Sequence, residues 1–248
     1  MDVQEKSRYA RQIRLSQIGE EGQQKLLDAT VLIIGMGGLG SPAAMYLAAA
    51  GVGHLIVSDF DRVEASNLQR QIIHRTQDMG ELKAFSARRT LAEINPGCRV
   101  DAIDWQLDED ELESYLAKAD VVLDCSDNFP TRFMVNRVSV KTGTPLVSGA
   151  AIRMEGQIAS YIPGSGGPCY QCLYKEQFEH TETCAMEGVL SPVVGVIGTM
   201  QALQALLILM GKFDGFNGKL MLFDGLSMEW QSVKIPRNPA CPVCSELS

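Results

Sequence analysis

The stretch Thr30–Val57, TVLIIGMGGLGSPAAMYLAAAGVGHLIV, decides the fold. It begins with Thr30–Ile34, an apolar and β-branched run that predicts a strand, and continues into the glycine-rich turn Gly35–Gly40. Ser41–Ala50 predicts a helix that is broken at Gly51-Val52-Gly53, and a second apolar run follows to Val57. A strand, a turn, a helix and a second strand form the core of a parallel α/β sheet.

The alternation of helices and strands continues beyond this unit. The predicted elements are helix Lys83–Ile94, strand Arg99–Ile103, helix Glu109–Ala119, strand Val121–Asp124, helix Asn136–Thr142 and strand Pro145–Val147. Gln157–Ile162 and Lys219–Phe223 show the period-two alternation of antiparallel strands, and residues 7–28 predict two short helices. We therefore expect an α/β fold: a Rossmann-like parallel sheet that continues into antiparallel strands, with N-terminal helices, in a single domain of residues 1–248.

The composition is that of an ordinary soluble protein, with 46% hydrophobic and 21% charged residues. The net charge of −8 argues against binding to nucleic acid or to an anionic membrane. No apolar segment resembling a secretory signal opens the chain, so we expect a cytoplasmic location. Val189–Met210 is long enough for a membrane span, but Gln201 and Gln204 within it favour a buried core helix.

The seven cysteines include two pairs with the spacing of zinc knuckles. An odd count without an export signal makes disulfides improbable and favours metal or catalytic roles. Cys169 and Cys172 form one pair, and Cys241 and Cys244 form the other. Four thiolates suit a tetrahedral structural Zn²⁺ that has no open position for catalysis. A redox C-x-x-C and simple buried thiols are the alternatives.

The other cysteines differ in their surroundings. Cys98 and Cys125 lie in or beside apolar strands and are expected to be buried. Cys184 lies in a polar stretch without clear periodicity, KEQFEHTETCAMEGVL. A thiol in an exposed loop acts as a nucleophile or forms a persulfide, but an incidental surface cysteine fits this stretch equally well.

The turn GMGGLG fits the pattern G-x-G-x-x-G between a strand and a helix. Its glycines, Gly38 among them, allow phosphate oxygens to approach backbone N–H groups, and the helix N-terminus adds partial positive charge. Asp59 follows the second strand, at the position of an acid that holds a ribose. The sequence favours nucleotide binding, and the alternative is a tight turn that only packs.

A polar cluster after Asp59, in DFDRVEASNLQRQ, exceeds what a nicotinamide site requires. Its hydrogen-bonding side chains are Asn67, Arg70 and Gln71, and the guanidinium grips phosphate oxygens as a fork. Lys83 adds a second cation, and Asp127 follows a buried strand where an acid holds Mg²⁺. Taken singly, Lys83 is typical of a solvated helix residue and Asp127 of a helix N-cap. Together they predict an ATP–Mg²⁺ site.

The chain resembles a known family. Its motifs occur in the same order in the bacterial members of the ubiquitin-activating-enzyme superfamily, which adenylate ubiquitin-like sulfur carriers. The motifs, spread from Arg8 to Cys244, are RYARQ, GMGGLGSP, DFDRVEASNLQRQ, CSDN, SGAAIRMEGQI, PCYQC, PVVGVIGTMQA and PACPVC. SGAAIRMEGQI and the ending RNPACPVC favour the branch that serves molybdopterin synthase, in molybdenum-cofactor biosynthesis. The branch that serves the thiazole carrier, in thiamine biosynthesis, is very similar.

The resemblance implies a reaction and a set of roles. The carboxylate of a carrier's Gly-Gly tail attacks the α-phosphate of ATP, which gives an acyl-adenylate and pyrophosphate, and a sulfur donor later forms the thiocarboxylate. By resemblance, Asp59 holds the ribose, and Asp127 serves Mg²⁺ and the reacting end. The implied phosphate-side residues are Gly38, Asn67, Arg70 and Lys83, with Gln71 nearby.

The resemblance also implies partners. Arg11 would reach into the partner subunit's site, so a homodimer is expected; from the residues alone, Arg11 reads as part of a solvated helix face. The four paired cysteines would hold zinc, and the position of Cys184 carries covalent sulfur chemistry in the thiazole branch. Residues 1–28 would be N-terminal helices, residues 29–150 the nucleotide-binding half, and residues 151–248 the carrier-binding and zinc half. We expect no appended rhodanese-like domain, so the persulfide donor would be a separate protein.

Three other functions fit parts of the sequence. A nicotinamide-linked dehydrogenase explains the glycine turn and Asp59 but gives Asn67, Arg70 and Lys83 no task. A zinc-stabilised scaffold would dock a carrier without chemistry. An ATP-dependent relative that activates a carboxylate on modified tRNA fits the acidic balance and the cysteine pairs less well.

Overall fold

One mixed sheet forms the centre of the computed structural model, which describes residues 1–175 and 187–245. Its eight strands run in the order β3-β2-β1-β4-β5-β6-β7-β8. The strands are β1 Thr30–Ile34, β2 His54–Ser58, β3 Arg99–Ile103, β4 Val121–Asp124, β5 Leu146–Ile152, β6 Glu155–Tyr161, β7 Lys219–Asp224 and β8 Glu229–Lys234. The pairings from β3 to β5 are parallel, and those from β5 to β8 are antiparallel. The predicted fold class is confirmed.

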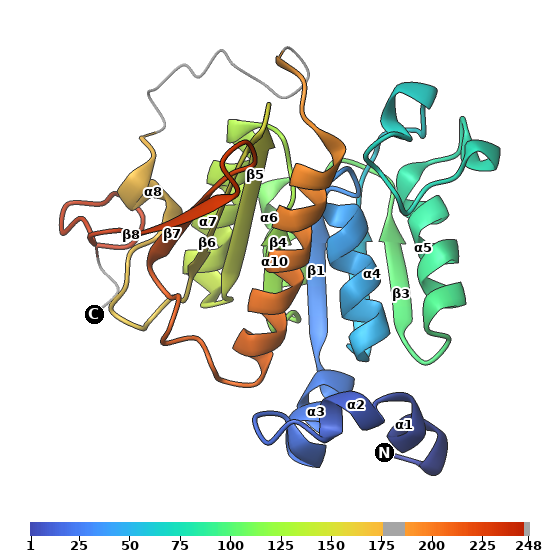
Figure 1. Cartoon of the computed structure of the whole chain (residues 1–248). Helices are drawn as coiled ribbons and strands as arrows, with labels where there is room; N and C mark the ends of the chain where they lie inside the picture. Colours follow the sequence, from blue (N-terminus) through green and yellow to red (C-terminus); the bar gives the residue numbers. More distant parts are fainter. Residues whose placement is uncertain (176–186, 246–248) are drawn as a thin grey trace.

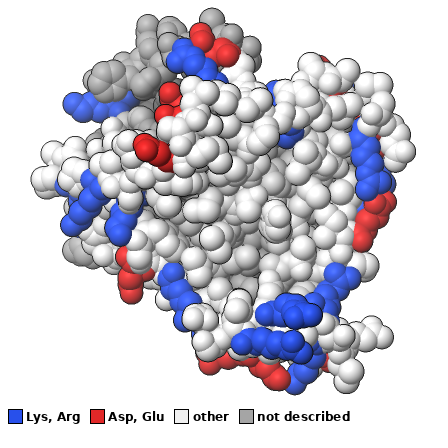
Figure 2. All heavy atoms as spheres, viewed as in Figure 1, with Lys and Arg blue, Asp and Glu red and all other residues white. Residues whose placement is uncertain are grey.

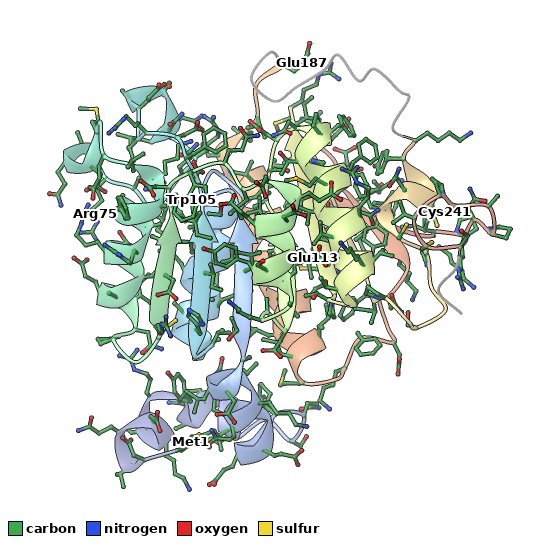
Figure 3. The ribbon with its side chains drawn as sticks, turned by 180° about the vertical axis from the view of Figure 1, so that it is seen from behind. Met1, Arg75, Trp105, Glu113, Glu187 and Cys241 are labelled. Carbon is green, nitrogen blue, oxygen red and sulfur yellow. The ribbon has the colours of Figure 1, made fainter. Side chains whose placement is uncertain are left out.

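Helices cover both faces of the sheet (Figure 1). The helices are α1 Val3–Arg8, α2 Ala10–Ile13, α3 Gly19–Asp28, α4 Gly40–Ala50, α5 Lys83–Ile94, α6 Glu109–Leu116, α7 Phe129–Thr142, α8 Tyr170–Leu173 and α10 Ser191–Leu209. One face carries α4, α5 and α10, and the other, seen from behind in Figure 3, carries α6 and α7. A hydrophobic core fills the space on each side of the sheet.

The structure adds to the predicted elements in three places. Residues 7–28 hold two short helices, α2 and α3, as predicted, and an additional helix, α1, precedes them because Asp2 caps it with a capping box. Asn136–Thr142 lies in α7, as predicted, and the helix begins earlier, at Phe129, since Asn128 caps it and Pro130 occupies its first turn. Strand β8 was not predicted. All six of its residues are exposed, so the sequence shows no alternation between a buried and a solvated face.

The apolar helix α10 lies in the core and packs against α4, β5 and β6. Of the helices that the structure describes, α10 alone is long and apolar enough to cross a membrane, but half of it is buried inside the protein. Gln201 is fully buried, and its Nε2 donates to the carbonyls of Asp124 at 2.8 Å and Val147 at 3.2 Å. Gln204 accepts a hydrogen bond from Ser160. The prediction of a buried core helix is confirmed, because both glutamines bond to the sheet.

Two glycines of α10 provide a matched test of this packing. A Cβ on Gly198 would lie 2.2 Å from the carbonyl oxygen of Leu39, whereas a Cβ on Gly195 meets nothing within 4 Å. We expect Gly198→Ala to lower the free energy of unfolding by about 1–3 kcal/mol, since a backbone atom does not rotate away. Gly195→Ala should raise it by roughly 0.5–1 kcal/mol through helix propensity. Urea denaturation measures both, and equal midpoints would contradict the packing described.

Candidate active site

A cavity of about 750 Å³ opens at the carboxyl ends of the parallel strands and extends over the antiparallel half. Strand β1 pairs with β2 on one side and β4 on the other, so this is the point where the strand order reverses, a common ligand site. The parallel half contributes Gly35, Gly37, Gly38, Asp59, Asp61, Arg70, Gln71, Lys83, Ser126, Asp127 and Arg132 to the wall. The antiparallel half contributes Glu155, Gln157, Leu222, Phe223, Asp224, Glu229 and Gln231. The volume is suitable for a nucleotide-sized ligand.

The glycine turn closes tightly between β1 and α4. Gly35 has a φ of +92°, which favours glycine, and its N–H donates to Ser58 O at 2.8 Å. A Cβ on Gly40 would lie 1.9 Å from the carbonyl oxygen of Gly35, so only glycine fits there. Among the described residues, the N–H groups of Gly37 and Gly38 donate to no other residue. They remain available to phosphate oxygens at the cavity wall.

Asp59 lies beside this turn, and its carboxylate accepts hydrogen bonds from backbone N–H groups. Its Oδ2 accepts from the N–H of Met36 at 2.8 Å, and its Oδ1 accepts from the N–H of Asp61 at 2.9 Å. Burial raises the pKa of Asp59, and the nearby Lys83 ammonium only partly opposes that shift. The arrangement fixes one carboxylate at the end of β2.

Lys83 is nearly buried at the start of α5 and is not the solvated residue that its type would suggest. Its Nζ lies 2.8 Å from Asp61 Oδ2 and 4.0 Å from Asp59 Oδ1, and its side chain is 7% exposed. The ammonium is therefore held at the cavity wall by two carboxylates. Asp61 was not singled out in the sequence, although its place in the motif DFD could have indicated a partner for the lysine.

Of the three residues predicted in the polar segment after β2, two line the cavity and one does not. Arg70 and Gln71 line the cavity, and Arg70 Nη1 donates to Ser66 O at 3.0 Å. Gln71 is buried, and its Oε1 has no hydrogen-bond partner among the described residues. Asn67 does not line the cavity. Its Oδ1 accepts from Glu64 N–H at 3.3 Å, which shapes the 3₁₀ turn η1, Ala65–Asn67.

Asp127 is exposed and faces the cavity from the loop after β4. It does not cap α7, because Asn128 does so by accepting from Thr131 N–H at 2.9 Å. The Asp127 carboxylate is therefore free of the capping role that its position also allowed. The preceding Asp124 is buried and accepts from the hydroxyls of Ser126 and Ser148. These bonds hold the loop that carries Asp127.

Arg132 is a cavity residue that the sequence did not reveal. Its side chain is buried, Nη2 donates to Ser126 O at 2.7 Å, and the guanidinium lies 5.9 Å from the ring centroid of Phe129. Burial is the largest single influence and lowers the pKa of Arg132, but the Asp124 carboxylate, Tyr170 and Tyr174 together outweigh it, so the pKa is raised. Because it occurs within a helix, Arg132 reads in the sequence as an ordinary surface arginine.

The four paired cysteines come together at the far edge of the sheet from α5, as Cys241 shows in Figure 3. The Sγ of Cys169 lies 3.6 Å from that of Cys241, and the Sγ of Cys172 lies 3.5 Å from that of Cys244. All four sulfurs lie within 4.8 Å of one another. Tetrahedral zinc with Zn–S bonds of about 2.3 Å places sulfurs roughly 3.8 Å apart, so the cluster fits the ion.

The remaining predicted residues lie elsewhere. Arg11 is exposed on α2, and the N-terminal helices pack at the opposite end of the sheet from the cavity (Figure 1). There Gln12 Nε2 donates to Ala50 O at the end of α4. Figure 2 shows Lys and Arg side chains, with acidic ones beside them, gathered over this lower end. Arg11 thus does not reach the cavity of its own chain, and Cys184 lies outside the described residues.

Comparisons with known proteins agree with this geometry. Residues 9–243 match the ThiF family. The sulfur carrier protein ThiS adenylyltransferase of Escherichia coli (strain K12) is 46% identical over 237 residues, which cover 96% of this chain and 94% of that protein. The molybdopterin-synthase adenylyltransferase of the same strain is 44% identical over 243 residues, 98% of each chain. The crystal structure of E. coli MccB with ATP has a TM-score of 0.82 at 25% identity, over 96% of this chain and 73% of that one. Matched over nearly its whole length in sequence and in fold, this chain belongs to the ThiF family.

Proposed function

We propose that this protein adenylates the C-terminal Gly-Gly carboxylate of a small ubiquitin-like sulfur carrier, using ATP and Mg²⁺. The observation that carries the proposal is the single cavity that joins two different surfaces. At one end lie the glycine turn and the cations of Arg70, Lys83 and Arg132. The other end runs over β6, β7 and β8, where an extended tail can lie. A nucleotide and a carboxylate are thereby brought to one place.

The reaction needs attack of a carboxylate on a triphosphate, which is mainly a problem of charge repulsion and positioning. The carrier's carboxylate oxygen forms a bond to the α-phosphorus, and the bond to the pyrophosphate oxygen breaks. Arg70 and Lys83 supply positive charge to the phosphate oxygens, Asp59 receives the ribose hydroxyls, and the turn N–H groups hold the phosphates. Asp127 is the carboxylate placed to bind Mg²⁺, which would neutralise charge on the triphosphate when bound. Asn67 would act through the loop that carries Arg70.

The carrier of molybdopterin synthase is the favoured substrate, on the strength of SGAAIRMEGQI and RNPACPVC. The carrier of thiazole synthesis is the alternative, and the two E. coli relatives are similar to this chain to nearly the same degree. The far wall of the cavity is acidic, with Glu155, Asp224 and Glu229 adjacent across three strands. A carrier whose tail carries positive charge before its Gly-Gly end would fit that wall best.

A homodimer completes the proposal. The outer face of α10 and neighbouring α4 leaves Leu203 48% and Tyr46 56% exposed, an apolar surface that a second copy would cover. Arg11, exposed and remote from its own cavity, would then enter the partner's.

We place the reaction in a reducing cytoplasm, where the four clustered cysteines hold zinc. A separate persulfide protein supplies sulfur, and Cys184 is a candidate acceptor for it.

The test is ATP–pyrophosphate exchange with each carrier. We expect exchange that requires Mg²⁺ and a carrier ending in Gly-Gly, with the molybdopterin-type carrier giving the higher rate. A carrier that lacks its terminal glycine is the control and should support none. Binding of NAD in place of ATP–Mg²⁺ would favour a dehydrogenase, and absence of exchange with every carrier would favour a scaffold. The same assay with Cys184→Ser, followed by a thiocarboxylate assay, separates adenylation from sulfur transfer.

A further inference from the structure

The backbone of Met36, inside the glycine turn, is held by a hydrogen bond on each side of its Cα. Its N–H donates to Asp59 Oδ2 at 2.8 Å, and its carbonyl oxygen lies 3.0 Å from Nε2 of His74. A carbonyl oxygen only accepts, so Nε2 of His74 carries the proton. Met36 stands between Gly35 and Gly37, whose backbones rotate more freely than those of other residues. Two hydrogen bonds therefore fix the backbone of Met36 between two conformationally free glycines.

A buried chain of polar groups stands behind His74. Its Nδ1 lies 2.8 Å from Ser86 Oγ, which lies 3.0 Å from Asp78 Oδ2, and Asp78 in turn pairs with Arg89 at 2.7 Å. His74 is 5% exposed, Ser86 is 0% exposed and Asp78 is 3% exposed. Burial lowers the pKa of His74, which favours the neutral ring at pH 7. Contacts at both ring nitrogens, with Met36 O and with Ser86 Oγ, fix the orientation of the ring.

We propose that His74 is a positioning residue for the phosphate-binding turn. By holding the carbonyl of Met36 opposite Asp59, it keeps the N–H groups of Gly37 and Gly38 directed at the cavity. The inference rests on the proposed function, because it assigns the turn to a nucleotide. Donors that are fixed before the ligand arrives lose less freedom on binding, so affinity depends on the tether as well as on the groups that touch phosphate.

The main alternative is that His74 only fills the core, and Thr90 offers a matched control. Thr90 is 7% exposed, and its Oγ1 donates to the carbonyl of Ile73, the residue next to His74, at 2.9 Å. Thr90→Val removes a buried hydrogen bond of the same kind, at almost the same place, without touching the glycine turn. An effect that exceeds this control comes from the contacts of His74 itself, and the His74→Gln variant, which restores a donor toward Met36 O, separates that contact from the one with Ser86.

The experiment compares His74→Phe, His74→Gln and Thr90→Val in the full-length protein. We expect His74→Phe to weaken ATP–Mg²⁺ binding about tenfold, the effect of one lost buried hydrogen bond. The amide of Gln stands in for Nε2–H, so His74→Gln should recover most of the affinity, and Thr90→Val should bind as the wild type does. Isothermal titration gives the dissociation constants.

Hydrogen exchange of the Met36 amide, measured without nucleotide, provides a second readout. It should quicken about tenfold in His74→Phe, because the freed peptide releases Asp59, and should not quicken in Thr90→Val. Equal exchange and equal affinity in His74→Phe and Thr90→Val would overturn the inference, as would a failure of His74→Gln to restore either. If the wild type binds no ATP, the proposed function fails, and the exchange rates still decide whether His74 holds the turn.

Discussion

Replacing Arg70 by alanine is expected to lower carrier-dependent pyrophosphate exchange on the order of 10²-fold or more, the cost of losing one fixed electrostatic stabiliser. The guanidinium lines the cavity and is anchored to Ser66 O, so it meets phosphate charge without first being ordered. Asp127→Ala should have a comparable effect, because its carboxylate is exposed to the cavity and has no capping role.

Two further variants test whether the loss of exchange depends on charge at the cavity rather than on removal of any charged side chain. Arg75→Ala removes an arginine a few residues further on, whose guanidinium pairs with Glu93 at 3.3 Å at the outer edge of the molecule (Figure 3). It should retain full exchange. Asp127→Asn keeps the shape of the side chain and removes its charge, so it should fall nearly as far as Asp127→Ala. Exchange near the wild-type rate in both Arg70→Ala and Asp127→Ala would show that the site is assigned wrongly.

Loss of the metal centre is expected to have the largest effect on stability. Cys241→Ser removes one of four clustered thiolates, and the free energy of unfolding should fall on the order of 4 kcal/mol. For a chain of this size the melting temperature would drop by about 8–16 °C. Calorimetry measures the drop, and elemental analysis should find one zinc per chain in the wild type and none in the variant.

Cys98→Ser is the control for the metal centre. Cys98 is also buried, and burial raises the pKa of its thiol to about 11, but it lies in the core far from the cluster. Its replacement should cost only about 1–2 kcal/mol and leave the zinc content unchanged. A wild type that carries no zinc and melts at the same temperature as Cys241→Ser would contradict the metal assignment.

The elements most easily predicted from the sequence are the strands that are covered by helices on both faces of the sheet. Strand β4 is buried along its whole length and β1 is buried at its three central residues, so both form apolar runs that are easy to recognise. The cluster of four cysteines was also predictable, since C-x-x-C pairs have few other uses in a chain of this type. Strand β8 was not, because it is held by pairing with β7 and none of its six residues is buried.

The candidate site was less predictable, because its geometry depends on contacts between distant segments. Lys83 is held by Asp61, which lies 22 residues earlier and which only the motif DFD could have suggested. Arg132 is held by the backbone carbonyl of Ser126, an acceptor that leaves no mark in the sequence. Asn67 looks in the sequence like a phosphate ligand, but its side chain is used within its own turn. His74 contacts Met36, far back along the chain, and a histidine between apolar and charged residues carries no signal of that contact.

The position of α10 late in the chain has a consequence for biosynthesis. As the protein emerges from the ribosome, the parallel strands and α4 are complete long before Ser191–Leu209 is made. Until then α4 lacks the helix that packs beside it, and Gly38 lacks its neighbour Val194, 3.0 Å from where its Cβ would lie. A nascent chain that stops short of α10 would thus expose apolar surface and need a chaperone. Nucleotide affinity should arise only near the end of translation, as expected if residues 1–248 form one folding unit.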